Sequence, residues 1–253
     1  MLNLPIREKR PRNIGLNILI DNGYPIDFFK DVIISMNDKI DFIKFGWGTS
    51  IVSVFLEKKI NILKENNINY FFGGTLFEKF LYQNKLDEYK NFLDKYDCKY
   101  MEISNGTINI TNEEKTKYIK DFSLYYRVFS EVGLKDSNKS EEMSPKKWIE
   151  YIKQDIEAGA IKVITEARES GTSGMCRSNG DLRIGLLEEI IESELDINDI
   201  IFEAPNKKLQ VHFINKLGSN CNLANISFND IIALETLRLG LRSDTFFTFE
   251  KRS

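Results

Sequence analysis

The stretch Ile161-Lys-Val-Ile-Thr-Glu166 is short, rich in β-branched residues and ends on a glutamate. β-Branched and aromatic residues favour buried strands. A charge at the end of a buried strand is costly unless it is paired or bound to a metal. The same pattern recurs along the chain, in apolar runs that end at or near Asp21, Lys44, Glu102, Glu131 and Glu203. The simplest geometry that explains the recurrence gathers these strand ends at one place.

Eight strands are predicted from such runs, and segments with helical periodicity separate them. The predicted strands are Leu16–Asp21, Asp41–Gly46, Ile68–Gly73, Lys99–Ser104, Tyr126–Val132, Ile161–Glu166, Asp199–Ala204 and Asn222–Ile226. Strand and helix alternating eight times predict an α/β fold with a parallel sheet, and eight such units close into a (β/α)8 TIM barrel of about 250 residues. We expect one barrel domain over residues 1–253, with 1–15 as an N-terminal extension and 245–253 as a C-terminal tail. An open doubly wound sheet is the alternative, but no GxGxxG motif follows the first strand.

Composition and charge exclude several classes of function. The net charge of -3 gives no electrostatic case for a nucleic-acid partner. No apolar segment approaches the roughly 18 residues that span a membrane, and the N-terminus lacks the apolar core of a signal peptide. The cysteines Cys98, Cys176 and Cys221 form no CxxC pair, as suits a reducing cytosol. We expect a cytoplasmic protein with no membrane partner.

His212 is the single histidine, and it lies in a probable amphipathic helix away from the strand ends. Histidine triads and histidine-ligated metals are therefore excluded. Catalysis must use carboxylates, lysines, arginines or a metal with oxygen ligands.

Side chains alternate along a strand, so parity predicts which residues face the barrel axis. If the terminal glutamates point inward, Tyr100, Phe129, Ile164 and Ile201 lie beneath them; likewise Phe42 lies below Lys44, and Leu19 below Asp21. A ring of carboxylates around one lysine suits a hard divalent cation, most simply Mg²⁺. The expected metal ligands are Asp21, Glu102, Glu131, Glu166 and Glu203. The alternative is that several of these acids pair with Lys44, Lys135, Arg127 or Arg168 and only hold the barrel mouth together.

The segment Ser170-Gly-Thr-Ser-Gly174 follows the sixth strand and is small, hydroxylated and glycine-rich. Such a loop can present backbone N–H groups to a phosphate or sulfonate, although many similar strings are plain loops. Arg168 adds a guanidinium that can grip an anion. Chain direction places Arg12 near the bottom of the barrel, so Arg12 is a weaker candidate ligand than Arg168. Lys162 lies near the start of the sixth strand, also at the bottom, which weakens a Schiff-base aldolase interpretation.

Seven strings in this order resemble the phosphosulfolactate synthase family, and together they cover the chain from Arg10 to Asp244. They are Lys44-Phe-Gly-Trp-Gly-Thr-Ser50, Gly73-Gly-Thr-Leu-Phe-Glu78, Glu102-Ile-Ser-Asn-Gly-Thr107, Ser130-Glu-Val-Gly-Leu-Lys-Asp136, Glu166-Ala-Arg-Glu-Ser-Gly171, Glu203-Ala-Pro-Asn206 and Leu234-Glu-Thr-Leu-Arg-Leu-Gly-Leu-Arg-Ser-Asp244. The resemblance implies a Mg²⁺-dependent barrel enzyme that adds sulfite to phosphoenolpyruvate, giving (2R)-phospho-3-sulfolactate, as at the start of coenzyme M biosynthesis. The family also resembles plant heat-stress-associated proteins. Leu134 departs from the polar or basic residue that often follows the glycine of the strand-five loop.

The residues fit this chemistry. Sulfite is itself a strong nucleophile, and its attack produces an enediolate-like dianion that Mg²⁺ and a lysine can stabilise. We assign the proton delivered to C2 to Lys135, with Lys44 as the electrostatic partner of the substrate carboxylate or phosphate and Glu131 beside them. Substrate binding is assigned to Asn105, Arg168, Ser170, Gly171 and Gly174. We also expect a homo-oligomer. Two alternatives are a non-catalytic stress or interaction protein, and another barrel lyase or aldolase that acts on a phosphorylated enol.

Overall fold

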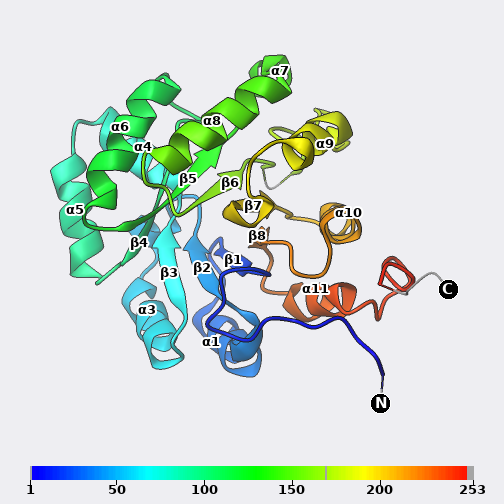
Figure 1. Ribbon diagram of the computed structural model, residues 1–253. Coiled ribbons are helices and arrows are strands. Elements are labelled where there is room, and N and C mark those ends of the chain that lie inside the picture. Colours follow the sequence, from blue (N-terminus) through cyan, green and yellow to red (C-terminus); the bar gives the residue numbers. More distant parts are fainter. Residues whose placement is uncertain (1, 169, 250–253) are drawn as a thin grey trace.

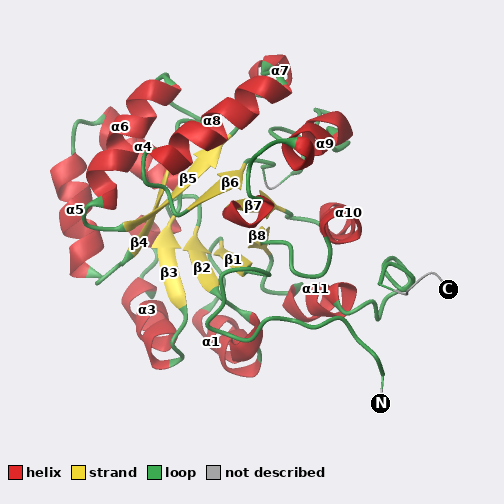
Figure 2. Ribbon diagram, viewed as in Figure 1, coloured by secondary structure: helices red, strands yellow, loops and turns green. Residues whose placement is uncertain are grey.

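The computed structural model describes residues 2–168 and 170–249. Residue 169, which opens the predicted loop after the sixth strand, and residues 250–253 of the predicted tail lie outside the described residues. Within them, eight parallel strands form a barrel with helices on its outer face (Figures 1 and 2). The predicted (β/α)8 barrel is confirmed.

Every strand lies inside its predicted range. The strands are β1 (Asn17–Asp21), β2 (Phe42–Phe45), β3 (Asn69–Phe72), β4 (Tyr100–Ile103), β5 (Arg127–Val132), β6 (Lys162–Thr165), β7 (Ile200–Glu203) and β8 (Leu223–Ile226). They are hydrogen-bonded in the order β3-β2-β1-β8-β7-β6-β5-β4, and β3 contacts β4 where the barrel closes. Parallel pairing places the carboxyl ends of all the strands on one face, where the active sites of such barrels lie.

The helices form the outer ring and return the chain to the bottom of the barrel. They are α1 (Ile26–Ser35), α2 (Thr49–Val52), α3 (Leu56–Glu65), α4 (Gly74–Tyr82), α5 (Leu86–Lys95), α6 (Asn112–Ser123), α7 (Ser137–Glu142), α8 (Pro145–Glu157), α9 (Ile184–Glu192), α10 (Lys207–Leu217) and α11 (Ile231–Arg238), with short 3-10 turns at Asn37–Lys39 and Ile197–Asp199. Local signals set their starts. Thr111 and Glu114 form a capping box at α6, and the Ser144 hydroxyl accepts from the Lys147 N–H at α8. None of the helices in the described residues is both long and apolar enough to cross a membrane.

Two apolar layers follow from strand parity. The barrel interior holds a small cluster made of Leu16, Ile18, Phe42, Phe71, Phe129, Ile164, Ile201 and Ala224, with Tyr100 and Ile161 against it. The larger core lies between the strands and the outer helices. The predicted inward positions are confirmed on β2, β4, β5, β6 and β7. On β1 the prediction was wrong: Leu19 belongs to the outer core and Ile18 faces inward.

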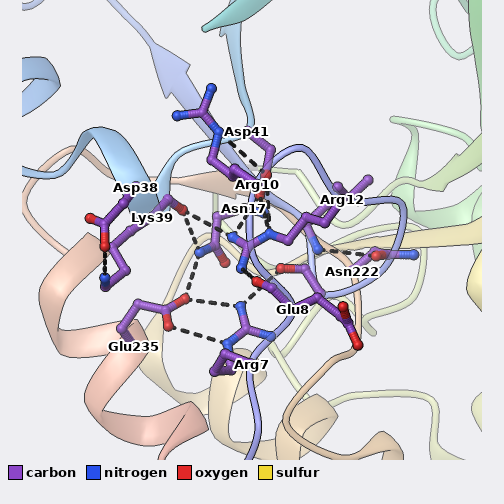
Figure 3. Close-up of polar contacts among 12 residues, drawn as sticks. Arg7, Glu8, Arg10, Arg12, Asn17, Asp38, Lys39, Asp41, Asn222 and Glu235 are labelled. Carbon is purple, nitrogen blue, oxygen red and sulfur yellow. Dashed lines mark hydrogen bonds and ion pairs between the residues drawn. The ribbon is translucent and has the colours of Figure 1, made fainter. Parts of the chain in front are cut away.

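The N-terminal arm, residues 2–13, lies at the bottom of the barrel, and Figure 3 shows the polar contacts that its arginines make there. Arg7 pairs with Glu235 of α11 at 3.0 Å, and Arg12 pairs with Asp41 at 2.8 Å. The Asp41 carboxylate also accepts from the Asn17 N–H, so the arm is fixed to the start of β1 and β2. A cavity of about 1600 Å³ lies between this arm and the barrel floor. The predicted bottom position of Arg12 is confirmed.

Candidate active site

Five charged side chains meet inside the barrel at its carboxyl end. Lys44 comes from the end of β2, Glu102 from β4, Glu131 from β5, Glu166 from the residue after β6, and Glu203 from β7. Each is buried, with at most 6% of its surface exposed. The alternation of strand side chains places all five above the interior aromatic and aliphatic layer. The strand-end acids predicted from the sequence are therefore brought together, with the exception of Asp21.

Lys44 is the cation at the centre of this cluster. Its Nζ lies 3.0 Å from Glu102 Oε2, 3.3 Å from Glu203 Oε1 and 3.7 Å from Glu131 Oε2. Burial lowers the pKa of Lys44, but the three carboxylates raise it well above its usual value. Lys44 is thus held as an ammonium ion. The pairing alternative that the sequence left open is realised for these three acids.

Lys135 supplies a second cation at the mouth of the barrel. Its Nζ lies 3.7 Å from Glu131 Oε1 and 3.9 Å from Glu166 Oε2, and it donates to Thr75 Oγ1 at 2.8 Å. Its side chain is 28% exposed, so it faces the opening while the acids below it do not. Burial lowers the pKa of Lys135, but Glu131 and Glu166 raise it above the usual value. Its ammonium therefore stays protonated at neutral pH.

Gly133 brings the Lys135 loop close to the acids. Its φ is +131°, a conformation that residues with a side chain rarely adopt. A Cβ at this position would also lie 2.6 Å from Glu166 Cβ. The glycine therefore permits the tight turn after β5 that places Lys135 over Glu131 and Glu166.

Four glutamates share two lysines, so the cluster carries more acids than cations. Burial raises the pKa of Glu102 to about 8, and it raises the pKa of Glu166 as well. Burial also acts on Glu131, but Lys135 and Lys44 outweigh it and lower the pKa of that carboxyl to about 2. The cluster therefore holds protons that a further cation could replace.

The cluster offers carboxylate oxygens, which are the kind of ligand that Mg²⁺ prefers. Among the described residues, Glu102 Oε2, Glu131 Oε1 and Glu166 Oε2 are buried oxygens that accept no hydrogen bond. No three acid, cysteine or histidine side chains in the described ranges stand ready to enclose a metal ion. Mg²⁺ does not need such a cage, because it usually takes one or two carboxylates and keeps several of its waters. Each of these three oxygens also lies 3.0 to 3.9 Å from a lysine ammonium, so an ion bound here would share them with Lys44 and Lys135.

Asp21 is placed differently from the other predicted ligands. One carboxylate oxygen accepts from the N–H groups of Gly23 and Tyr24, at 2.9 and 3.0 Å. The other lies 2.6 Å from Lys59 Nζ, which is buried beside it on α3. Both oxygens of Asp21 thus have partners on the outer side of the strand, with Leu19, and the structure does not bring them to Lys44.

The loop after β6 contributes Arg168 to the mouth. Its NH1 group donates to the Lys135 carbonyl at 3.3 Å. The Gly171 N–H donates to the Arg168 carbonyl, and the Gly174 N–H donates to Ser140 Oγ. The N–H groups of Gly171 and Gly174, two of those expected to cradle an anion, therefore already have acceptors. The Ser170 hydroxyl contacts that of Thr172 at 2.7 Å.

Asn105 lies in the loop after β4, where its side chain donates to the Ile110 carbonyl at 3.1 Å. The same loop is held by Glu78, which sequence reasoning did not single out. Glu78 is buried and accepts from Ser104 Oγ at 2.5 Å and from the N–H groups of Thr107 and Ile108 at 2.8 Å. Its position on a helix face otherwise made of apolar residues was the available signal. Thr75, which holds Lys135, carried no such signal.

Comparisons with known proteins show which family and which fold the chain resembles. Residues 5–244 match the model of the (2R)-phospho-3-sulfolactate synthase (ComA) family. A phosphosulfolactate synthase of Bacillus subtilis is 59% identical over 246 residues, which cover 97% of this chain and 98% of that one. Protein HEAT-STRESS-ASSOCIATED 32 of Arabidopsis thaliana is 22% identical over 92% of this chain and 88% of its own. Among solved structures, a thiamine phosphate pyrophosphorylase from Pyrococcus furiosus is similar in fold, with a TM-score of 0.55 and 11% identity over 94% of this chain and 98% of that one.

Proposed function

The chain belongs to the (2R)-phospho-3-sulfolactate synthase family and is an enzyme of that type, and from this premise we propose that it adds sulfite to phosphoenolpyruvate at the cluster of Lys44, Lys135 and the strand-end glutamates. The observation that carries the proposal is the pair of protonated lysines that form ion pairs with buried glutamates at the barrel mouth. Such a site binds a polyanion and stabilises charge that develops on it.

The reaction needs no nucleophile from the protein. Sulfur attacks C3 of phosphoenolpyruvate and forms the C–S bond, while the C2–C3 π electrons move into the substrate carboxylate. The resulting enediolate-like dianion then takes a proton at C2. Phosphate stays on the product throughout.

Lys135 is the residue we assign to deliver that proton. It is the more exposed of the two lysines, and Thr75 fixes its ammonium group at the mouth. Its raised pKa keeps the proton in place until the dianion, a much stronger base, is formed. Water returns a proton to the lysine after turnover.

Lys44 acts as a fixed positive charge below the reacting atoms. Its three carboxylate contacts keep it protonated, which removes it as an amine nucleophile. Lys162 lies at the start of β6, where its Nζ donates to the Asn198 carbonyl. Neither lysine therefore suits a Schiff-base aldolase.

Mg²⁺ is the proposed cofactor, and Glu102 and Glu131 are its proposed ligands. Both contribute an oxygen that accepts no hydrogen bond in the described part of the chain, as does Glu166. When bound, the ion supplies a Lewis acid that offsets charge on the substrate carboxylate. Glu203 accepts from the Ala167 N–H at 3.0 Å and supports the β6 end, so we place it outside the ligand set. Asp21 is left out for the reason given above.

The phosphate is assigned to Arg168 and Ser170, whose side chains lie on the loop after β6, with Asn105 across the mouth. Gly171 and Gly174 stay assigned to the phosphate only because of their small size, since their N–H groups have acceptors within the protein. Arg168 adopts a φ of +51°, which turns this loop sharply at the rim of the barrel.

The direct test is an assay of phosphoenolpyruvate consumption with sulfite, with and without EDTA. We expect loss of the enol absorbance only when sulfite and Mg²⁺ are both present, without release of inorganic phosphate. Absence of turnover at millimolar sulfite would refute the proposed reaction. A homo-oligomer, a cytoplasmic location and a place in coenzyme M biosynthesis stay predictions.

A further inference from the structure

A second buried ion pair lies directly behind the cluster, on the outer side of β5. Lys115 of α6 and Asp155 of α8 approach to 2.7 Å, and their side chains are 1% and 0% exposed. Asn112 also donates to Asp155, at 3.4 Å. Neither charge is accessible to substrate, so the pair has no direct part in the reaction.

Lys115 also holds the backbone of the active-site strand. Its Nζ donates to the main-chain carbonyl of Glu131 at 2.9 Å. The paired stretch of β4 and β5 ends at Ser130, so this carbonyl lies just beyond it. The lysine thus supplies a donor where the pairing of β5 with β4 stops, although the pairing with β6 continues to Val132, and Asp155 fixes the lysine.

Apolar side chains at positions 115 and 155 would stabilise the fold as well as the ion pair does. Apolar replacements of a buried ion pair are often neutral or stabilising, because removing two charges from water is costly. At this position, however, the ion pair can also fix the geometry of the active site. Glu131 Oε1 is 3.7 Å from Lys135 and Glu131 Oε2 is 3.7 Å from Lys44, so a small movement of the β5 end changes both contacts.

We propose that Lys115 and Asp155 are positioning residues, which fix the end of β5 and thereby set Glu131 against Lys135 and Lys44. The expected change in kcat rests on the proposed function. The expected movement of the β5 end does not.

The test uses the double variant Lys115→Met with Asp155→Leu, which removes both charges and leaves none buried alone. We expect kcat for sulfite addition to fall by about 10- to 100-fold, since misplacement by about 1 Å can cost 100-fold. KM for phosphoenolpyruvate should change little, because the groups assigned to the phosphate are untouched. Amide hydrogen exchange should become faster in residues 131–135.

The matched control is Arg7→Met with Glu235→Leu, a partly buried pair at the opposite end of the barrel. It should alter stability without changing kcat or exchange in residues 131–135. If the first double variant does not fold, Lys115→Arg, which keeps the charge and displaces the donor, should show the same fall in kcat at constant KM.

Two outcomes separate the proposals. A wild-type protein without sulfite-dependent turnover refutes the reaction, and hydrogen exchange then decides the positioning role by itself. An active wild type, with unchanged kcat and unchanged exchange in the Lys115 variants, overturns the positioning role and leaves the reaction standing.

Discussion

Replacing Lys44 by methionine tests the charge balance of the site most directly. The substitution keeps the length of the side chain and removes the cation that three buried carboxylates share. At an effective dielectric constant near 20, Coulomb's law gives about 5.0 and 4.5 kcal/mol for the contacts with Glu203 and Glu131 at 3.3 and 3.7 Å. The contact with Glu102 at 3.0 Å adds about 5.5 kcal/mol once that carboxyl, whose pKa is about 8, has lost its proton. Most of this attraction offsets the cost of burying the charges.

The net loss of stability should therefore be about 3–5 kcal/mol at neutral pH, as for other buried pairs that lose one partner. Loss of Lys44 removes the main group that lowers the pKa of Glu102, so that pKa should rise further in the folded state. The stability of the variant should then be highest at low pH and should be lost as the pH rises through the raised pKa. Mg²⁺ should restore part of it, because the ion replaces the missing charge.

Urea unfolding at several pH values, with Mg²⁺ or EDTA, measures these effects. The control is Lys64→Met, which removes an exposed lysine 3.6 Å from Asp97 and should cost less than about 1 kcal/mol. A Lys44→Met protein as stable as the wild type at pH 8 in EDTA would show that the acids do not depend on this lysine.

Three further results are expected. Lys135→Ala should lower kcat by about 10²–10⁴, equal to about 2.7–5.4 kcal/mol, while circular dichroism and the melting temperature stay near those of the wild type; a fully active variant contradicts the proton assignment. Arg7→Met should cost about 3 kcal/mol at pH 7. Burial raises the pKa of Glu235, but Arg7 outweighs it and lowers that pKa. The loss of stability in the variant is therefore present above the ordinary glutamate pKa of about 4.3 and disappears as the pH falls through the lower folded pKa. Urea unfolding between pH 3 and 7 measures this loss, and a loss that does not change with pH would contradict the pairing. Mg²⁺ binding should strengthen as the pH rises toward about 8, where Glu102 loses its proton, and calorimetry in buffers of different ionisation enthalpy should detect the released protons; binding without proton release removes Glu102 from the ligand set.

The fold could be predicted in detail because each strand carries its own signal. Apolar runs of four to six residues, each followed by a helical segment, leave few alternatives to a barrel. On β4, β5 and β7 the sequence also predicted that the glutamate near the strand end points into the barrel, because the residue two positions earlier is large and apolar. These are local properties, and the sequence shows them directly.

The strand β1 shows where parity fails. It is apolar at successive positions from Ile18 to Ile20, so the pattern is compatible with either direction of Asp21. Lys59, the partner of Asp21, lies on a helix 38 positions away in the sequence, and only the tertiary fold brings the two residues together. For the same reason, the role of Lys115 could not be inferred from its own segment. For Glu78, the apolar helix face around it indicated burial but did not identify its partners in the loop after β4.

The N-terminal arm gives the barrel an unusual order of assembly. Arg7 and Glu235 are 228 positions apart, and Arg238 of α11 reaches back to Asn17 across 221 positions. These contacts can form only after nearly the whole chain is available, and such distant contacts slow folding. A circular permutant opened between β3 and β4, where the hydrogen-bonded series of strands ends, would bring Arg7 and Glu235 close together in the sequence. Such a rearranged chain should reach the native barrel sooner, although every native contact outside the new junctions is the same.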